Sequence, residues 1–223
     1  MVRKVVFHVM KDIIDENVKL ANELQKEFNE AGVKVLEFLG GPGSGKTSII
    51  ERLIPLLLKN YEPNEIGYIG GDIATSFDTE RIARYGVRAV QINTGGTCHL
   101  EVRHVRKAIE ALGGLRGLKI LFIENVGNLI CPFSFPLGAH ARILVLDVAS
   151  GEDKPLKHPM SVRKSDIIVV NKIDIAKPLG VDVEKIIELA RKVNPKAPIM
   201  PVSAKTGEGI IQLYSLLKKL LDI

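Results

Sequence analysis

The stretch TGGTCHLEV places Cys98 beside His99 in a segment rich in glycine, and the chain has only one other cysteine, Cys131. Two thiols and one imidazole are donors that suit Zn²⁺ or Ni²⁺, so these three residues form a candidate metal site. A free cysteine is more often a small buried side chain, and a disulfide between Cys98 and Cys131 is a further alternative. The neighbouring motifs must decide between these interpretations.

The segment GGPGSGKT (40–47) fits the phosphate-binding pattern G-x-x-x-x-G-K-[ST]. A strand-like run precedes it and a helical pattern follows it, which is the context that the motif requires. We expect backbone N–H groups to surround the phosphates, Lys46 to reach the β- and γ-phosphates, and the Thr47 hydroxyl to ligate Mg²⁺. The expected phosphate site consists of Gly41, Pro42, Gly43, Ser44, Gly45, Lys46, Thr47 and Ser48.

Two further motifs indicate which base is bound. In NKID, Asn171 and Asp174 follow an apolar run, and Asp174 can accept from the two adjacent N–H donors of guanine, a pattern that adenine lacks. The stem of Lys172 can pack along the base. The later motif SAK supplies Ser203, Ala204 and Lys205, and the Ser203–Ala204 backbone is expected to donate to the guanine carbonyl. Together these motifs predict binding of GTP.

Two acidic residues follow strand-like runs at positions where a magnesium site is expected, Asp72 in GGDIATSFD and Glu124 in LFIENVGN. Each is expected to bind Mg²⁺ directly or through water, although ordinary loop carboxylates are the alternative. For GTP hydrolysis, Lys46 and Mg²⁺ would stabilise charge on the phosphates, while Asp72, or else Asp78, would orient the attacking water. The candidate catalytic residues are therefore Lys46, Asp72, Asp78 and Glu124.

Short β-branched runs alternate with segments of helical character along the chain. Near-continuous apolar strands that alternate with helices predict an α/β fold of the P-loop NTPase type, with a mostly parallel sheet of about seven strands and helices on both faces. We predict a single GTPase domain over residues 1–223, with an amphipathic helix at about 11–30 and a candidate functional loop at 129–140. The strands are expected at 33–39, 66–71, 87–93, 118–125, 141–148, 165–172 and 198–203.

Composition narrows the classes of partner. The chain has 31 Lys and Arg residues and 26 Asp and Glu residues. Because the two signs are interleaved and no basic helix carries aromatic residues, we expect a solvated surface and no nucleic-acid partner. No apolar run approaches a membrane span, so no membrane partner is expected. Two cysteines and no leader-like segment favour the cytoplasm.

In order along residues 30–220, the segments GGPGSGKTS, GDIAT, INTGGTCHLE, ILFIENVGNLICP, GEDKPLKHP, NKIDI and SAKTGEG resemble those of the HypB family of hydrogenase nickel-incorporation GTPases. ENVG stands where Ras-like proteins have D-x-x-G, which is similar to the metallochaperone and signal-recognition branch of P-loop GTPases. The urease accessory GTPases, which carry Cys-Pro-His and a strand end like ESGGDNL, are the alternative within this branch.

The resemblance implies a slow GTPase that helps to insert nickel into [NiFe] hydrogenase, with a hydrogenase nickel-delivery accessory protein and the hydrogenase large subunit as partners. It favours metal ligation by Cys98, His99 and Cys131 over packing, with the missing ligand supplied by water, His104 or a second subunit. His104 is otherwise a helix-surface histidine. It further implies a homodimer promoted by GTP, in which Lys154 of GEDKPLKHP (151–159) reaches nucleotide across the dimer rather than lying on a solvated loop.

Two alternatives from other classes remain. A regulatory GTPase switch would bind effectors and carry no metal, and the Cys and His residues distinguish it from a metallochaperone. A P-loop enzyme that phosphorylates a small molecule is third, because such enzymes rarely need the guanine contacts that NKID and SAK provide.

Overall fold

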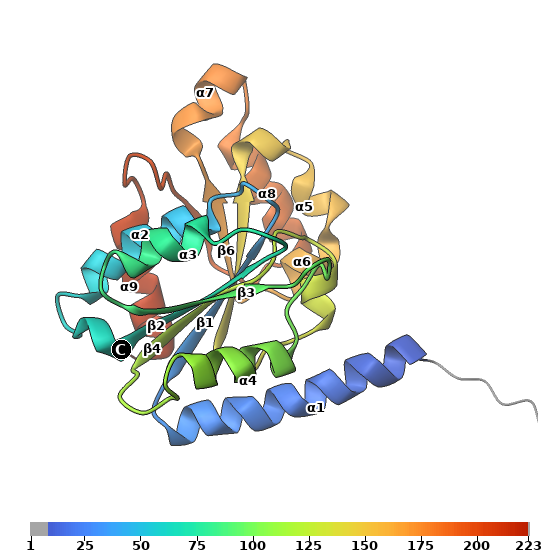
Figure 1. The fold of residues 1–223 in the computed structure, drawn as a ribbon. Helices are drawn as coiled ribbons and strands as arrows, with labels where there is room; N and C mark the ends of the chain where they lie inside the picture. Colours follow the sequence, from blue (N-terminus) through green and yellow to red (C-terminus); the bar gives the residue numbers. More distant parts are fainter. Residues whose placement is uncertain (1–8, 223) are drawn as a thin grey trace, which may run out of the picture.

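Seven strands form one sheet in the order β3-β2-β4-β1-β5-β6-β7, and every neighbouring pair is parallel. The computed structural model describes residues 9–222, with helices on both faces of the sheet (Figure 1). The predicted parallel α/β sheet is therefore confirmed. The predicted domain also includes residues 1–8 and 223, which lie outside the described part. The strands are β1 (Lys34–Gly40), β2 (Ile66–Asp72), β3 (Arg88–Asn93), β4 (Ile120–Glu124), β5 (Ala141–Asp147), β6 (Ile167–Asn171) and β7 (Ile199–Pro201).

The helices differ widely in length, and short 3₁₀ turns (η) lie between them. The predicted amphipathic helix is α1, which begins two residues before the expected start and buries Leu24 and Phe28. The helices are α1 (Val9–Glu30), α2 (Lys46–Leu57), α3 (Phe77–Ala83), α4 (Val102–Ala111), α5 (Lys154–Lys157), α6 (Pro159–Arg163), α7 (Ala176–Leu179), α8 (Val183–Val193) and α9 (Ile210–Leu221), with η1 (Pro63–Glu65), η2 (Cys131–Ser134), η3 (Val148–Ser150) and η4 (Ile173–Ile175).

Alternate side chains of the strands pack into cores on opposite faces of the sheet. On one face, Phe38 and Val145 pack against α2 and α9. On the other face, α1 and α4 cover β4, while α6 and α8 cover β5 and β6. Since both faces are buried, the strands consist almost entirely of apolar residues, which is why the sequence pattern was informative.

The carboxyl ends of the strands bring the motifs to one edge of the sheet. The phosphate loop follows β1, the Cys98–His99 segment follows β3, the 129–140 segment follows β4, and Asn171 ends β6. The first strand, β1, lies between β4 and β5, so the order of the strands reverses beside the phosphate loop. Ligands of open α/β sheets bind at such a reversal.

One segment differs from its predicted form. Residues 151–159 were expected to be a loop, but they contain the short helix α5, whose first residue is Lys154. Pro155 stands in its first turn, where a missing N–H costs nothing, and Lys157 forms an ion pair of 2.7 Å with Asp153 one turn earlier. These local interactions explain the helical turn.

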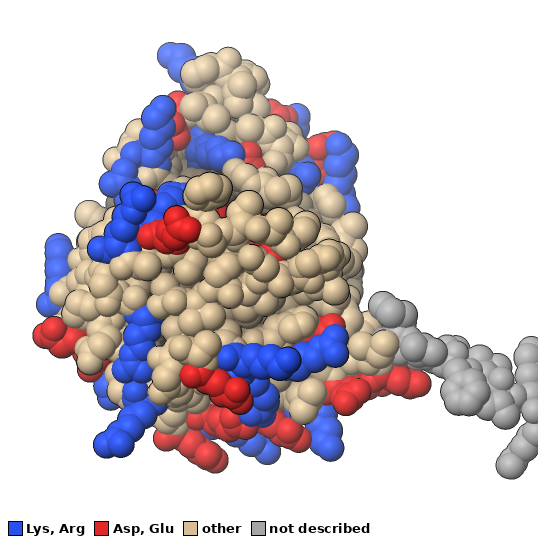
Figure 2. Space-filling view, viewed as in Figure 1, with Lys and Arg blue, Asp and Glu red and all other residues tan. Residues whose placement is uncertain are grey.

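The surface carries charges of both signs. Figure 2 shows Lys and Arg side chains interspersed with Asp and Glu around a broad uncharged area on this face. Within residues 9–222, none of the helices combines the length and the apolar character needed to cross a membrane.

Candidate nucleotide and metal sites

The phosphate loop has a backbone that requires glycine. Gly45 has a φ of +95°, and a Cβ at this position would lie 2.2 Å from Asn171 Nδ2. A Cβ at Gly40 would lie 2.5 Å from the carbonyl oxygen of Val145. The helix α2 begins directly after Gly45, so the N–H groups of its first turn have no acceptor within the helix and point toward the loop. This arrangement can bind phosphate groups.

Glu124 is the buried centre of the charged part of this site. Its Oε1 accepts a hydrogen bond of 2.9 Å from Thr47 Oγ1 and lies 3.8 Å from Lys46 Nζ. Its Oε2 accepts a bond of 2.8 Å from the Tyr68 hydroxyl. Burial raises the pKa of Glu124 above its ordinary value, and the Lys46 ammonium offsets only part of this rise. The structure thus brings Lys46, Thr47 and Glu124 together, as the sequence predicted.

The other two acidic candidates share a small cavity with Lys46 and Glu124. This cavity, of about 190 Å³, is lined by Asp72, Asp78, Lys46 and Glu124 among others. Asp72 accepts bonds of 3.1 Å from the Ala74 N–H group and from the Thr75 hydroxyl. Mg²⁺ that binds beside phosphates is held by carboxylate and hydroxyl oxygens of the kind found around this cavity.

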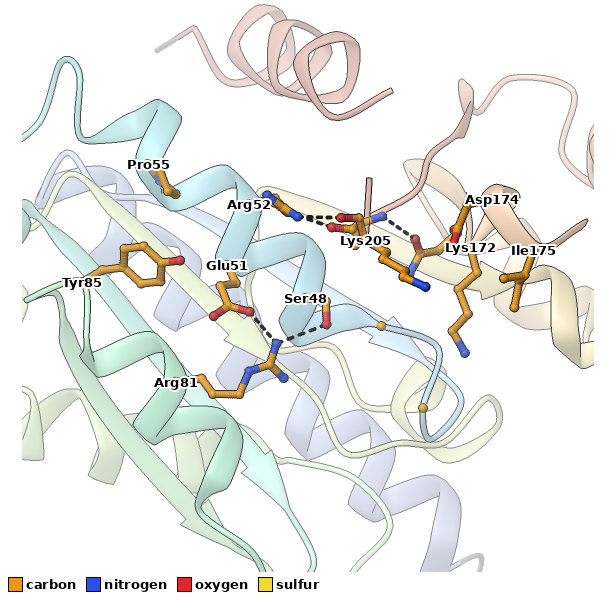
Figure 3. Close-up of a pocket in the computed structure, with 14 residues that line it drawn as sticks. Ser48, Glu51, Arg52, Pro55, Arg81, Tyr85, Lys172, Asp174, Ile175 and Lys205 are labelled. Atoms are coloured by element: carbon orange, nitrogen blue, oxygen red, sulfur yellow. Dashed lines mark hydrogen bonds and ion pairs between the residues drawn. The ribbon is translucent and has the colours of Figure 1, made fainter. Parts of the chain in front are cut away.

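A larger cavity of about 760 Å³ lies between the phosphate loop and the NKID and SAK motifs (Figure 3). Asn171 lines this cavity beside the phosphate loop, where its Nδ2 donates to the Ser44 carbonyl at 2.9 Å. Asp174 lines the cavity and accepts a bond of 2.6 Å from Ser203 Oγ. Lys172, in the left-handed conformation, also lines it. The cavity is large enough for a nucleoside, and Asp174 retains oxygen lone pairs for a base.

The expected donor to the guanine carbonyl differs in the structure. The Ser203 N–H group donates to the Glu208 carbonyl at 2.9 Å, and the Ala204 N–H group donates to Asn171 Oδ1 at 3.1 Å. Both amides are therefore engaged within the protein. The Lys205 N–H group has no hydrogen bond among residues 9–222 and is the better candidate donor.

Two arginines at this cavity were not predicted from the sequence. Arg52 donates to the Ala204 and Lys205 carbonyls, each at 2.7 Å, and so fixes the SAK loop to α2. Arg81 donates to Ser48 Oγ at 3.2 Å and forms ion pairs with Glu51 and Asp78, as Figure 3 shows for the first two. No local motif marks either arginine. The partners of Arg52 lie on another element, as do Ser48 and Glu51 for Arg81, while Asp78 lies on the same helix as Arg81.

The predicted soft-metal residues lie close together. One donor atom each from Cys98, His99 and Cys131 lies within 4.8 Å of the other two, and both cysteines are free thiols, against the disulfide alternative. His99 stacks on Phe135 with ring centroids 4.0 Å apart. Its buried Nε2 has no hydrogen-bond partner within the described chain and lies 3.8 Å from Glu101 Oε1. Burial lowers the pKa of His99, while the neighbouring Cys98 thiol, followed by burial, raises the pKa of Cys131. The nitrogen of His99 beside the thiols is Nδ1, which lies 3.8 Å from Cys98 Sγ. A neutral imidazole with one nitrogen beside two thiols fits a Zn²⁺ or Ni²⁺ ion.

The remaining two candidates lie apart from these groups. His104 is in the first turn of α4, where its Nδ1 accepts a bond of 3.1 Å from the Glu101 N–H group, so it caps the helix and is not part of the three-residue cluster. Lys154 begins α5 and lines neither of the two cavities.

Comparison with known proteins assigns the family. The profile of the CobW/HypB/UreG nucleotide-binding domain matches residues 34–201. A protein named "Probable hydrogenase maturation factor HypB" from Methanocaldococcus jannaschii is 42% identical over 214 residues, which cover 96% of this chain and 95% of that protein. The chain belongs to the HypB family.

Solved HypB structures share the fold over almost the whole chain. HypB from Archaeoglobus fulgidus superposes with a TM-score of 0.85 at 37% identity, covering 93% of this chain and 99% of the other. HypB from Helicobacter pylori, in a crystal structure in complex with nickel, has a TM-score of 0.84 at 33% identity and covers 93% and 95%. Membership of the HypB family makes this chain a nucleotide-binding protein with a P-loop GTPase fold.

Proposed function

We propose that this chain is a GTP-hydrolysing metallochaperone that helps to insert nickel into [NiFe] hydrogenase. The observation that carries the proposal is the cluster of Cys98, His99 and Cys131, because it lies at the same sheet edge as the nucleotide cavities. A nickel complex of a HypB protein with 33% sequence identity supports nickel as the cargo. A regulatory GTPase without metal would have no use for such a cluster.

GTP occupies both cavities in this proposal. Asp174 accepts from the guanine N–H groups, and the phosphates lie against the first turn of α2 beside Lys46. Mg²⁺, when bound, neutralises phosphate charge, and Thr47, Glu124 and Asp72 are the residues that would hold it. Asp72 or Asp78 accepts a hydrogen bond from the attacking water and so aligns it with the γ-phosphate. Turnover is slow, because burial raises the pKa of Asp72 less than its hydrogen bonds with Ala74 and Thr75 lower it, which leaves a weak base.

The metal site is completed by another molecule. Three donors leave a tetrahedral or square-planar ion one ligand short, and His104 is engaged in capping α4. Water or a second copy of the chain supplies the missing ligand. Ile73, Phe77 and Ile130, exposed by 50%, 72% and 69%, flank the nucleotide and metal loops and support a homodimer promoted by GTP on this side. Lys154 then contacts nucleotide of the partner rather than its own.

The cellular setting follows from the hydrogenase role. The chain acts in the cytoplasm as a single GTPase domain, and its partners are the accessory protein that delivers nickel and the hydrogenase large subunit. Urease maturation is the second candidate, because a relative from H. pylori, 36% identical over 91% of this chain, is named "Hydrogenase/urease maturation factor HypB".

The test combines metal binding and turnover. Purified protein is titrated with Ni²⁺ and Zn²⁺ by calorimetry, in parallel with Cys98→Ala and Cys131→Ala, and phosphate release from GTP and ATP is measured. We expect stoichiometric metal binding that either substitution weakens strongly, and hydrolysis of GTP but not of ATP. Metal binding that is unaffected by both substitutions would overturn the metallochaperone proposal and favour the regulatory switch.

A further inference from the structure

Glu37 is a fully buried carboxylate in the middle of the central strand β1, and neither nucleotide cavity uses it. It shares a face of the strand with Val35 and Leu39, both of which are core residues. A buried charge is costly unless it is paired and hydrogen-bonded. Its place among the apolar side chains of Val35, Leu36, Phe38 and Leu39 therefore requires hydrogen-bonded partners.

The first oxygen of Glu37 orients the side chain of Asn125. Asn125 Nδ2 donates to Glu37 Oε1 at 2.8 Å, and Asn125 is itself fully buried. With the amide held in this orientation, Asn125 Oδ1 accepts from the N–H groups of Leu100 at 3.0 Å and of Val126 at 2.9 Å. Because Leu100 directly follows His99, this bond anchors the Cys98–His99 segment.

The second oxygen of Glu37 orients the side chain of Arg142. Arg142 lies opposite Glu37 on β5, and its Nε donates to Glu37 Oε2 at 3.1 Å. Its Nη2 donates to the Pro132 carbonyl at 3.0 Å, and the guanidinium lies 5.1 Å from the centre of the Phe133 ring. Because Pro132 directly follows Cys131, these contacts anchor the second metal-binding segment.

We infer that Glu37 is a positioning residue which, through Asn125 and Arg142, holds the two segments of the metal site at the separation that binding requires. This inference rests on the proposed role of the Cys98–His99–Cys131 cluster. The two segments come from different crossovers of the sheet, and the Glu37 carboxylate is bonded to both anchors. Groups that orient metal ligands typically contribute 10–100-fold to metal affinity.

The two acceptor oxygens of the carboxylate are the essential feature. Asn125 and Arg142 both present donors to Glu37, so both of its side-chain oxygens must accept. A glutamine at this position has one acceptor and one donor, and its NH₂ group would face the N–H of one partner. If Asn125 rotates its amide to accept, its NH₂ group then faces the Leu100 and Val126 N–H groups. Either way, one of the two anchors is lost.

The test compares Glu37→Gln with Leu217→Ala, which removes buried apolar contacts of α9 on the opposite face of the sheet. Ni²⁺ and Zn²⁺ affinities are measured by calorimetry on the full chain, at a temperature where every variant is folded, and Co²⁺ spectra report the geometry of the site. We expect Glu37→Gln to weaken binding by about tenfold or more and to change the Co²⁺ spectrum. Leu217→Ala should leave the metal affinity and the Co²⁺ spectrum unchanged. Neither variant should change the affinity for GDP.

Hydrogen exchange on the metal-free protein gives an independent measurement. Glu37→Gln should accelerate exchange at residues 98–101, where the Leu100 N–H group loses a stable acceptor. Arg142→Lys keeps a cation beside Glu37 but lacks the second nitrogen that reaches Pro132. It should therefore accelerate exchange at residues 131–135 and leave exchange at residues 98–101 unchanged. This variant replaces Glu37→Gln in the metal titration if the latter does not fold.

The outcomes separate this inference from the proposed function. In one outcome, Cys98→Ala and Cys131→Ala weaken metal binding, while Glu37→Gln and Arg142→Lys have the same metal affinity and exchange rates as Leu217→Ala. Glu37 is then only a structural residue, and the inference is overturned. If neither cysteine variant weakens metal binding, the proposed metal site itself is wrong.

Discussion

Thr47 Oγ1 donates a hydrogen bond of 2.9 Å to Glu124 Oε1, which joins the first turn of α2 to the end of β4. The two residues are 77 positions apart in the sequence, and separate motifs predict each of them as a magnesium ligand. Their contact places a hydroxyl oxygen and a carboxylate oxygen beside the Lys46 ammonium. A divalent cation that bridges phosphates needs such a pair of oxygen ligands near the phosphate loop.

Asp174 should determine which base is bound. In Asp174→Asn, one carboxylate oxygen becomes an NH₂ group that faces the guanine N–H donors. Mispairing of buried polar groups costs about 1–3 kcal/mol, so GTP affinity should fall by roughly tenfold or more, while xanthine nucleotide gains affinity. Calorimetric titration with GTP and XTP measures both changes.

Asp182→Asn is the matched control for this substitution. Asp182 caps α8 by accepting from the Glu184 and Lys185 N–H groups, and asparagine caps helices equally well. Its GTP affinity should equal that of the wild type. Equal GTP affinity of Asp174→Asn and Asp182→Asn would remove the basis for the guanine assignment.

Lys46 should matter for both chemistry and stability. Lys46→Ala removes the cation beside the transferred phosphate, and loss of one such electrostatic contact typically lowers kcat by about 10²–10³-fold. Because Lys46 is only 6% exposed and lies beside Glu124, its loss also leaves a buried carboxylate without its nearest cation. The free energy of unfolding of the nucleotide-free protein should therefore fall by about 1–3 kcal/mol.

Adding Glu124→Gln distinguishes the two effects of Lys46→Ala. The double variant no longer buries an unpaired charge, so denaturant unfolding should show most of the lost stability restored, while GTP hydrolysis stays at the lowered rate of Lys46→Ala. Retained hydrolysis in Lys46→Ala would contradict the proposed phosphate site.

Lys154 should act across the dimer. If it contacts the nucleotide of a second subunit, Lys154→Ala should reduce dimer content with a GTP analogue, measured by light scattering, and turnover with it, by several-fold. Lys157→Ala is the control, because Lys157 lies on the same helix but pairs with Asp153 of its own chain. If dimer content and turnover of Lys154→Ala and Lys157→Ala both equal those of the wild type, α5 lies on a solvated surface.

Local patterns of the sequence predicted all seven strands and α1, because buried parallel strands are nearly continuous apolar runs. The grouping of Cys98, His99 and Cys131 could also be predicted, since the carboxyl ends of all strands in a parallel sheet lie at the same edge. The roles of Glu37 and Arg81 could not, because Arg142 lies on a different strand from Glu37 and Glu51 on a different helix from Arg81, and no local pattern marks these pairs. The same holds for the Ser203 and Ala204 amides, whose acceptors are set by the folded loop.

Metal affinity should depend on the nucleotide. Glu124 lies in the phosphate cavity, and the next residue, Asn125, accepts from the Leu100 N–H group beside His99. A change in the position of Glu124 on binding the γ-phosphate is therefore transmitted to the Cys98–His99 segment. If GTP also favours a dimer that joins two incomplete sets of metal ligands, metal and GTP must tighten each other by the same factor.

The coupling is measured as the ratio of Ni²⁺ or Zn²⁺ affinities with a non-hydrolysable GTP analogue and with GDP, while light scattering follows dimer content. A coupling of about 1–3 kcal/mol, or roughly 5–150-fold in affinity, is expected for such a two-state element. Hydrolysis then lowers metal affinity and releases the ion to its acceptor. Cys98→Ala and Cys131→Ala should abolish the difference, because each removes a ligand from both nucleotide states. Equal metal affinities of the wild type with both nucleotides would mean that the metal and GTP sites lie at one edge of the sheet but are not thermodynamically coupled.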